Sequence, residues 1–216
     1  MNLPVIVIGA GGHAAVIADA LREAGTRVLG FTDPDVCLHG TMRVGLPVLG
    51  GDEVLATRSP KEVLLVNGLG FVSGSGRDSV RARVQQQLES RSWIFAPVIH
   101  PRAWISSYAS LAADAQVLAG AILQAGSVIG TGSIINSGAI VEHDTIVGDW
   151  CHVAPRATLC GQTRIGDGCL IGAGATVRQS LTLADNTLIG AGAVLLRDSA
   201  IGETLCGVPA RLLRKK

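Results

Sequence analysis

The second half of the chain places an aliphatic residue at every sixth position, from Ile105 through Ile201. The residue four positions after each of these is Ala, Ser, Thr or Cys, except at Leu181 and Leu205. A six-residue period is typical of a parallel β-helix, in which three hexapeptides close one triangular coil and positions 18 residues apart share a corner. We therefore predict a β-helix of roughly five coils, filled by the aliphatic side chains, and the period excludes a bundle of helices.

The first half of the chain has a different pattern, in which strand-like and helix-like segments alternate. Runs of buried-strand character cover 5–9, 28–33 and 61–68, and amphipathic helical patterns cover 13–25 and 78–91. Strands that alternate with helices indicate parallel strands, because each helix carries the chain back to the same edge of the sheet. The first half is therefore predicted to form a small α/β, Rossmann-like domain.

These two patterns predict the organisation of the chain. We expect an α/β domain over 1–92, a linker over 93–104, a β-helix over 105–206 and a C-terminal tail over 207–216. The composition agrees with this division, since 48% of the residues are hydrophobic and 28 are glycine, whereas only 3% are aromatic. A narrow prism has room for aliphatic and small side chains but not for large rings.

Charge and hydropathy narrow the classes of function. The net charge of +1 gives no basic field of the kind that binds nucleic acid. No stretch reaches the roughly 18 apolar residues of a membrane span, and the N-terminal sequence lacks the basic segment of a signal peptide. We therefore expect a cytoplasmic protein without membrane insertion. In that compartment the five cysteines are expected to be free thiols, and because their spacing matches no metal site, no metal is expected.

A glycine-rich segment, "GAGGHA" at 9–14, lies between the first predicted strand and the first predicted helix. Together with Asp33 at the end of the second strand, it fits the dinucleotide fingerprint, which alone suggests NAD and an oxidoreductase. The amide groups at a helix N-terminus attract phosphate. Because the domain is short for a complete dinucleotide fold and a β-helix follows it, a nucleotide sugar is the favoured ligand. A tight turn without a ligand is the alternative.

Several motifs give the whole chain a specific resemblance. They are "VIVIGAGGHAAVIADAL", "GFTD", "GLPVLGG", "NGLG", "IHPRAWIS", "VEHDTIVGDWCHVAP" and, after the last coil, "GVPAR". In order and spacing they resemble the hexapeptide-repeat (left-handed β-helix) acyltransferases. Within that group they are similar to the sugar acetyltransferases related to sialic acid O-acetyltransferase and to the UDP-4-amino-sugar N-acetyltransferases of bacillosamine synthesis. Such enzymes are typically homotrimers that bind acetyl-CoA between neighbouring β-helices, so the resemblance implies this fold, co-substrate and assembly.

Acetyl transfer needs a base for the acceptor, and His143 is the best candidate. It occupies the third position of the hexapeptide "VEHDTI", where the chain turns a corner and side chains point outward. Asp144 or Glu142 would orient the imidazole and stabilise its charged form. The resemblance favours Asp144, which directly follows the histidine that matches the family's catalytic histidine. A solvated histidine at a corner is the alternative.

His152 lies nine residues after His143, which is half a coil, so the two histidines would be on opposite sides of the prism. They could approach each other only across a subunit interface, where His152 would contact acetyl-CoA or the acceptor; otherwise it is a surface histidine. The resemblance implies that Asn136 lines the site and binds the acceptor or a water.

Other residues of the β-helix are assigned to the co-substrate. Gly161 stacks on the corner of His143, and its backbone N–H would donate to the thioester oxygen; a tight corner that requires glycine is the other explanation. By resemblance, Ala173 and Ala191 line the pantetheine arm of acetyl-CoA. Arg211 and the last two lysines would meet the phosphates of the coenzyme.

In the N-terminal domain, the resemblance assigns the nucleotide sugar to the glycine loop. Gly11, Gly12 and His13 would hold the diphosphate, and Asp33 would bind the nucleoside. Gly68, at the end of the third predicted strand, would lie close to the ligand.

We therefore predict an acetyl-CoA-dependent N-acetyltransferase that acetylates the amino group of a nucleotide-linked sugar in bacterial surface glycan biosynthesis, with a UDP-4-amino-sugar as the expected substrate. O-acetylation of a sialic-acid-type sugar would use the same residues with a hydroxyl acceptor, and the sequence does not separate the two. An NAD-dependent oxidoreductase and a non-catalytic β-helix scaffold are the remaining alternatives.

Overall fold

The structure is a computed structural model that describes residues 3–70 and 79–213 of the chain. The described chain divides into two compact units: the first covers 3–70 and 80–101, and the second covers 102–213 together with Ser79. Across these described residues, no helix combines the length and the apolar character that crossing a membrane requires.

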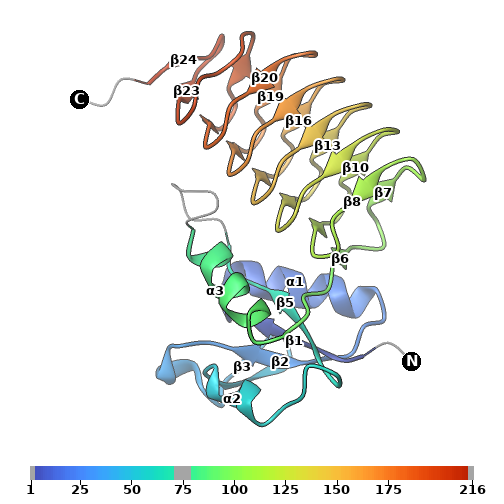
Figure 1. The fold of residues 1–216 in the computed structure, drawn as a ribbon, viewed down its shortest axis with the longest axis vertical. Helices are drawn as coiled ribbons and strands as arrows, with labels where there is room; N and C mark the ends of the chain where they lie inside the picture. Colours follow the sequence, from blue (N-terminus) through green and yellow to red (C-terminus); the bar gives the residue numbers. More distant parts are fainter. Residues whose placement is uncertain (1–2, 71–78, 214–216) are drawn as a thin grey trace. The chain divides into compact units, whose positions relative to one another are not determined.

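The first unit contains a five-stranded sheet and the two predicted helices (Figure 1). The predicted elements form as β1 (Val5–Ile8), α1 (Gly12–Glu23), β2 (Val28–Thr32), β5 (Leu64–Asn67) and α3 (Val80–Glu89). All residues of β1 are buried, and β1 pairs in parallel with β2 on one side and with β5 on the other. The predicted parallel α/β sheet is therefore confirmed. The first residue of the second predicted helix, at position 78, lies outside the described residues.

Other elements of the first unit were not predicted from the sequence. They are η1 (Val36–Leu38), β3 (Met42–Arg43), β4 (Leu46–Gly50), α2 (Glu53–Ala56) and β6 (Val98–Ile99). β4 pairs in parallel with β2 and antiparallel with β3, which gives the sheet order β3-β4-β2-β1-β5. β3 is too short to show an alternating pattern, and the proline and glycine within β4 are typical of turns, so neither strand was recognisable.

The second unit is a left-handed parallel β-helix whose short strands stack into three faces, each named after one of its strands (Figure 1). The β13 face contains β7 (Trp104–Ile105), β10 (Ile122–Leu123), β13 (Ile140–Val141), β16 (Thr158–Leu159), β19 (Thr176–Val177) and β22 (Val194–Leu195). The β14 face contains β8 (Ser110–Leu111), β11 (Val128–Ile129), β14 (Ile146–Val147), β17 (Arg164–Ile165) and β20 (Thr182–Leu183). The β15 face contains β9 (Gln116–Val117), β12 (Ile134–Ile135), β15 (His152–Val153), β18 (Leu170–Ile171), β21 (Leu188–Ile189), β23 (Thr204–Cys206) and β24 (Arg211–Leu212).

The interior of the prism is filled as the six-residue period predicts. Leu123, Val141 and Leu159, for example, are fully buried and stack in register on the β13 face, 18 residues apart. Cys151 and Cys169 are buried in the same core, and their S–H groups donate to backbone carbonyl oxygens of the next coil at 3.0 and 3.3 Å. All five cysteines are described and free. The predicted β-helix is confirmed over this region.

The prediction is wrong in the last coil, where the regular period ends. Ile189 pairs with Leu205, a step of 16 residues instead of 18. Leu205 is fully buried, whereas Ile201, which the period placed inside the prism, is 76% exposed. The last coil is two residues shorter than the regular coils, and the shortening lies before Ser199, which pairs with Leu183. Every later inward-facing position is therefore two residues nearer the N-terminus than the period predicts. A period counted from the first coil cannot detect this change of register.

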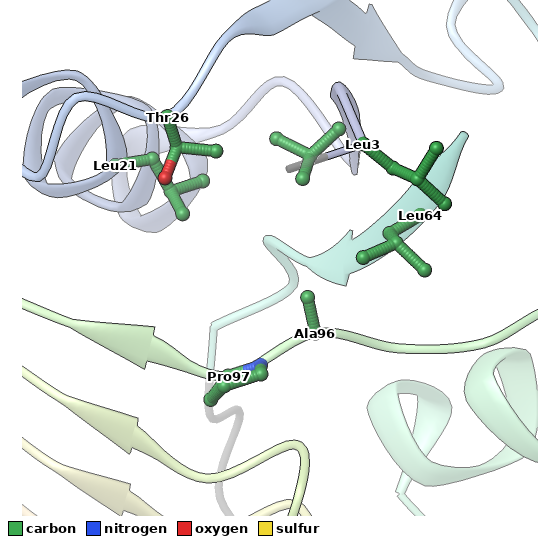
Figure 2. Close-up of a pocket in the computed structure, with 7 residues that line it drawn as sticks. Leu3, Leu21, Thr26, Leu64, Ala96 and Pro97 are labelled. Carbon is green, nitrogen blue, oxygen red and sulfur yellow. The ribbon is translucent and has the colours of Figure 1, made fainter. Parts of the chain in front are cut away.

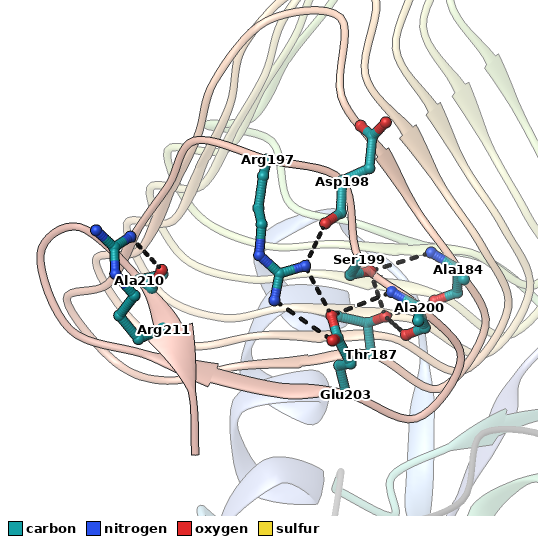
Figure 3. Close-up of polar contacts among 9 residues, drawn as sticks. All are labelled: Ala184, Thr187, Arg197, Asp198, Ser199, Ala200, Glu203, Ala210 and Arg211. Atoms are coloured by element: carbon teal, nitrogen blue, oxygen red, sulfur yellow. Dashed lines mark hydrogen bonds and ion pairs between the residues drawn. The ribbon is translucent and has the colours of Figure 1, made fainter. Parts of the chain in front are cut away.

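Side-chain hydrogen bonds hold the shortened coil at the C-terminal end of the prism (Figure 3). Arg197 pairs with Glu203 at 3.0 Å. The Ser199 hydroxyl accepts from the Ala184 amide at 3.1 Å and lies 2.7 Å from the Thr187 hydroxyl. β24 then runs back antiparallel along β23. These contacts close the end of the β-helix where the regular coils stop.

Candidate active site

His143 and Asp144 form a hydrogen-bonded pair at the corner between the β13 and β14 faces. His143 Nδ1 lies 2.9 Å from Asp144 Oδ2, and both side chains are exposed. The Glu142 carboxylate instead accepts from the backbone N–H of His143, at 3.4 Å. Asp144, rather than Glu142, is therefore the carboxylate on the imidazole ring.

This pairing sets the protonation pattern of the neutral imidazole. Because a carboxylate only accepts hydrogen bonds, the proton of the neutral ring lies on Nδ1 and the lone pair lies on Nε2. Within the described residues, Nε2 of His143 makes no hydrogen bond. The ring thus presents an unoccupied basic nitrogen at an outward corner, which is the arrangement that a general base requires.

Gly161 lies one coil beyond His143, directly against its ring. A Cβ atom built on Gly161 would lie 2.5 Å from His143 Nε2 and 2.7 Å from Cε1. The backbone of Gly161 is not in the left-handed region, so the corner itself does not require glycine. Its N–H donates no hydrogen bond within the described part of the chain. The glycine is therefore explained by the imidazole, and its amide N–H has no partner among the described residues.

Asn136 and His152 form a second polar pair, on the β15 face. The Asn136 side-chain oxygen accepts from the Ser137 amide at 2.7 Å, which fixes the orientation of its amide group. The NH₂ group of Asn136 then donates to His152 Nε2 at 2.9 Å. In this arrangement Nε2 of His152 is the acceptor, so the neutral ring carries its proton on Nδ1. It lies in β15, away from the corner of His143, as the half-coil spacing indicates.

Apart from Gly161, the residues assigned to acetyl-CoA lie away from the His143 corner. Ala173 and Ala191 are exposed and follow β18 and β21, so they stack at the corner between the β15 and β13 faces. Arg211 is exposed in β24 and donates to the Ala210 carbonyl oxygen at 3.2 Å (Figure 3). The two terminal lysines lie outside the described residues. The structure therefore places the assigned residues of the β-helix in two groups, one around His143 and one beside His152.

The glycine loop of the first unit lies at the N-terminus of α1. Gly11 is the N-cap of this helix and Gly12 is its first residue, followed by His13. A Cβ built on Gly11 or on Gly12 would meet no atom within 4 Å. These two positions therefore border open space, as a ligand that approaches the backbone requires.

Asp33 and Gly68 have structural partners of their own. The Asp33 carboxylate accepts from the Ala10 amide at 2.8 Å and from the Asp35 amide at 3.0 Å. It thus ties the end of β2 to the glycine loop. A Cβ on Gly68 would lie 2.5 Å from a methyl carbon of Val7 and would also clash with α1. Packing of the strand against the helix is therefore sufficient to explain Gly68.

Arg43 is a candidate binding residue that the sequence did not reveal. It lies in β3 and its Nε donates to the Gly11 carbonyl oxygen at 3.2 Å. Its guanidinium therefore lies beside the open N-terminus of α1. The sequence around Arg43 contains no recognisable binding motif. The hairpin that carries Arg43 was also not predicted, so its position beside the glycine loop could not be anticipated.

Two further features of the described residues bear on the choice of site. An apolar pocket is lined by Leu3, Val5, Leu21, Thr26, Leu64, Ala96 and Pro97 (Figure 2). It lies at the amino-terminal ends of β1 and β5, whereas the glycine loop follows the carboxyl end of β1.

Over residues 3–70 and 79–213, no three His, Cys, Asp or Glu side chains gather as ligands for a metal ion.

Comparisons with protein families find a match in each unit. Residues 4–88 match the family model of the PglD N-terminal domain. Residues 162–197 match the bacterial transferase hexapeptide family, over six repeats. No curated protein matches the sequence.

Solved structures of similar proteins cover almost the whole chain. The acetyltransferase domain of PglB from Neisseria gonorrhoeae, in complex with acetyl coenzyme A, is 34% identical, with a TM-score of 0.90 over 99% of this chain and 100% of that chain. A histidine-to-alanine mutant of GDP-perosamine N-acetyltransferase from Caulobacter crescentus, in complex with CoA and GDP-perosamine, is 31% identical, with a TM-score of 0.89 over 98% and 97%. WeeI from Acinetobacter baumannii, at 23% identity, shares the fold, with a TM-score of 0.79 over 98% and 100%. The chain belongs to the hexapeptide-repeat acetyltransferases that carry a PglD-type N-terminal domain.

Proposed function

We propose that this acetyltransferase transfers the acetyl group of acetyl-CoA to the amino group of a nucleotide-linked amino sugar, in bacterial surface glycan biosynthesis. The observation that carries the proposal is the His143–Asp144 pair, with Nε2 of the ring lying against the bare backbone of Gly161. The relatives support the choice of substrates, since one was solved with acetyl coenzyme A and another with CoA and GDP-perosamine.

The arrangement of the corner suggests how the transfer proceeds. As the sugar amine attacks the thioester carbonyl carbon, a C–N bond forms and His143 Nε2 takes the proton from the nitrogen. The carbonyl oxygen gains negative charge, which the Gly161 N–H stabilises. Collapse of this intermediate breaks the C–S bond, and the protonated ring returns the proton to the departing thiolate. The Asp144 carboxylate stabilises the imidazolium while it exists.

The nucleotide diphosphate is assigned to the first unit. Its phosphates would accept hydrogen bonds from the backbone N–H groups of Gly11, Gly12 and His13 and would be attracted by Arg43. Asp33 would bind the nucleoside through oxygen lone pairs that its two backbone hydrogen bonds leave free.

The co-substrate assignment rests on a homotrimer. Asn136, His152, Ala173 and Ala191 lie on one side of the β13 face, and His143 lies on the other, so a neighbouring β-helix would complete each site. The outward positions of the β13 face are aliphatic or threonine from Ile122 onward. We assign this face to the threefold axis, and Arg211 to the phosphates of the coenzyme. Light scattering at micromolar concentration should give three times the mass of the chain; a monomer would contradict the shared site.

Thiol release tests the reaction directly. The protein is incubated with acetyl-CoA and with UDP-, GDP-, TDP- and CMP-linked amino sugars, and free CoA is followed with a thiol reagent. We expect release with one nucleotide class and an acetylated amine in the product. Matched 4-hydroxy sugars distinguish O-acetylation, and the His143→Ala variant corrects for background hydrolysis. Absence of release with every acceptor, from a folded protein that binds acetyl-CoA, would contradict the proposed acceptor class.

A further inference from the structure

The His143–Asp144 pair lies between two corner positions that have no side chain. Gly161, one coil after His143, lies against its ring. Gly126 is one coil before Asp144, and a Cβ built on Gly126 would lie 2.6 Å from Asp144 Oδ1. Carbon and oxygen cannot approach this closely without a bond, so the carboxylate lies in space that any side chain at position 126 would occupy.

The backbone conformation of Gly126 favours glycine but does not require it. Its φ angle is +75°, but residues with side chains hold the same corner position in other coils with φ between +56° and +63°. These residues are Asp144, Trp150, Arg156, Gln162, Ser180 and Asn186. The β-helix therefore accepts side chains at this kind of corner. A side chain at Gly174 or Gly192, which hold the same position, would meet no atom within 4 Å, whereas position 126 has the Asp144 carboxylate lying against it.

We propose that Gly126 is a positioning residue for the proposed catalytic pair: its missing side chain lets the Asp144 carboxylate lie where Oδ2 reaches His143 Nδ1. The inference rests on the proposed function in taking this pair as the catalytic base. The Asp144 amide donates to the Ala125 carbonyl oxygen at 3.1 Å, which ties its backbone to the preceding coil, so a clash is relieved most easily by turning its exposed carboxylate. Turning the carboxylate lengthens the 2.9 Å contact that holds the proton on Nδ1.

The Gly126→Ala variant is the direct test. We expect kcat to fall about tenfold, with KM for both substrates changed less than about twofold, because the added methyl group displaces only the carboxylate that orients the base. The tautomer of His143, read from the ¹⁵N chemical shifts of its ring, should change from a proton held on Nδ1 to a mixture of both forms. The ring signals are assigned by their loss in His143→Ala.

Gly120→Ala is the matched control. Gly120 has φ +70°, and a Cβ there would meet its nearest atom at 3.9 Å, which is an ordinary contact. This variant carries the same backbone strain without the clash, so its kcat and the His143 tautomer should match the wild type. Circular dichroism and the melting temperature verify that both variants fold.

A double-mutant cycle keeps the test decisive if Gly126→Ala is destabilised. In an Asp144→Ala background the methyl group has no carboxylate to displace, so Gly126→Ala should change kcat less than about twofold. An equal loss of kcat in both backgrounds, or an unchanged His143 tautomer in Gly126→Ala, would overturn the positioning role. Failure of the proposed function has a different signature, since His143→Ala would then turn over normally while the tautomer still responded to Gly126→Ala.

Discussion

Two pairs of glycines, one pair in each unit of the molecule, differ in what a side chain would meet. In the first unit, a side chain at Gly11 or Gly12 would meet nothing within 4 Å, so these residues leave space open at the surface. In the β-helix, a side chain at Gly126 or Gly161 would collide with Asp144 or His143. The difference teaches that Gly11 and Gly12 leave the space that the proposed nucleotide sugar would occupy, whereas Gly126 and Gly161 leave room for the two side chains of the proposed catalytic pair.

The largest expected effect comes from removing the base, and it separates the proposed tasks of the two units. His143→Ala should lower kcat by about 10²–10⁴-fold, because the variant loses the imidazole nitrogen that accepts the proton in the proposed mechanism. Binding of the nucleotide sugar, measured by calorimetry, should be unchanged, because the glycine loop is untouched. A variant that lost binding and kept kcat would reverse the assignment of tasks.

A second prediction concerns the core of the β-helix and the break in its period. Ile171→Ala should lower the free energy of unfolding by about 2–5 kcal/mol, because the side chain is fully buried among stacked neighbours that cannot close the cavity. Ile201→Ala, at an equivalent position of the six-residue period, should cost less than about 0.5 kcal/mol because Ile201 is exposed. Urea unfolding of both variants measures the two costs. Equal costs would show that the regular period continues to residue 201 after all.

A third prediction sharpens the contrast between the two kinds of glycine. Gly12→Asp places a negative charge at the first residue of α1, where it should stabilise the helix by about 0.3–1 kcal/mol. The same charge should weaken binding of the nucleotide sugar by about tenfold to a hundredfold, because it repels the diphosphate. Calorimetry and thermal unfolding measure the two effects, with Gly12→Ala as the uncharged control. If Gly12→Asp bound the nucleotide sugar as tightly as the wild type, the diphosphate would not lie at this helix.

The sequence predicted the β-helix more completely than the α/β unit. The six-residue pattern of the β-helix recurs in every coil, so the period can be recognised even if one position is misinterpreted. The failure at Ile201 followed from a loss of two residues, which changes register without changing residue type. β3 and β4 were missed because neither is long enough, nor regular enough, to have a period of its own.

The candidate site was predictable where its residues are neighbours in the sequence. His143 and Asp144 are adjacent, and the hexapeptide phase put them at an outward corner, so their contact could be anticipated. Gly126 was missed because its partner, Asp144, lies 18 residues away in the sequence. Aligning the residues that share a corner, 18 positions apart, would have shown that the two are neighbours. Arg43 lies 32 residues from Gly11 on an unpredicted hairpin, and only the folded chain brings the two together.

The smallest expected effect concerns the Arg197–Glu203 pair, which lies in the shortened last coil of the described β-helix. Hydrogen bonds from Arg197 and from the Ala200 amide lower the pKa of Glu203. A carboxyl group whose pKa is lowered by folding stabilises the native state above its unfolded pKa, about 4.3, and this contribution disappears as the pH falls through the lower, folded pKa. Glu203→Gln should therefore cost less than about 1 kcal/mol near pH 7, since Arg197 is half exposed. Thermal unfolding should show a small difference from the wild type at neutral pH and none once Glu203 is protonated; a difference of the same size at both pH values would mean that packing, rather than charge, holds the last coil.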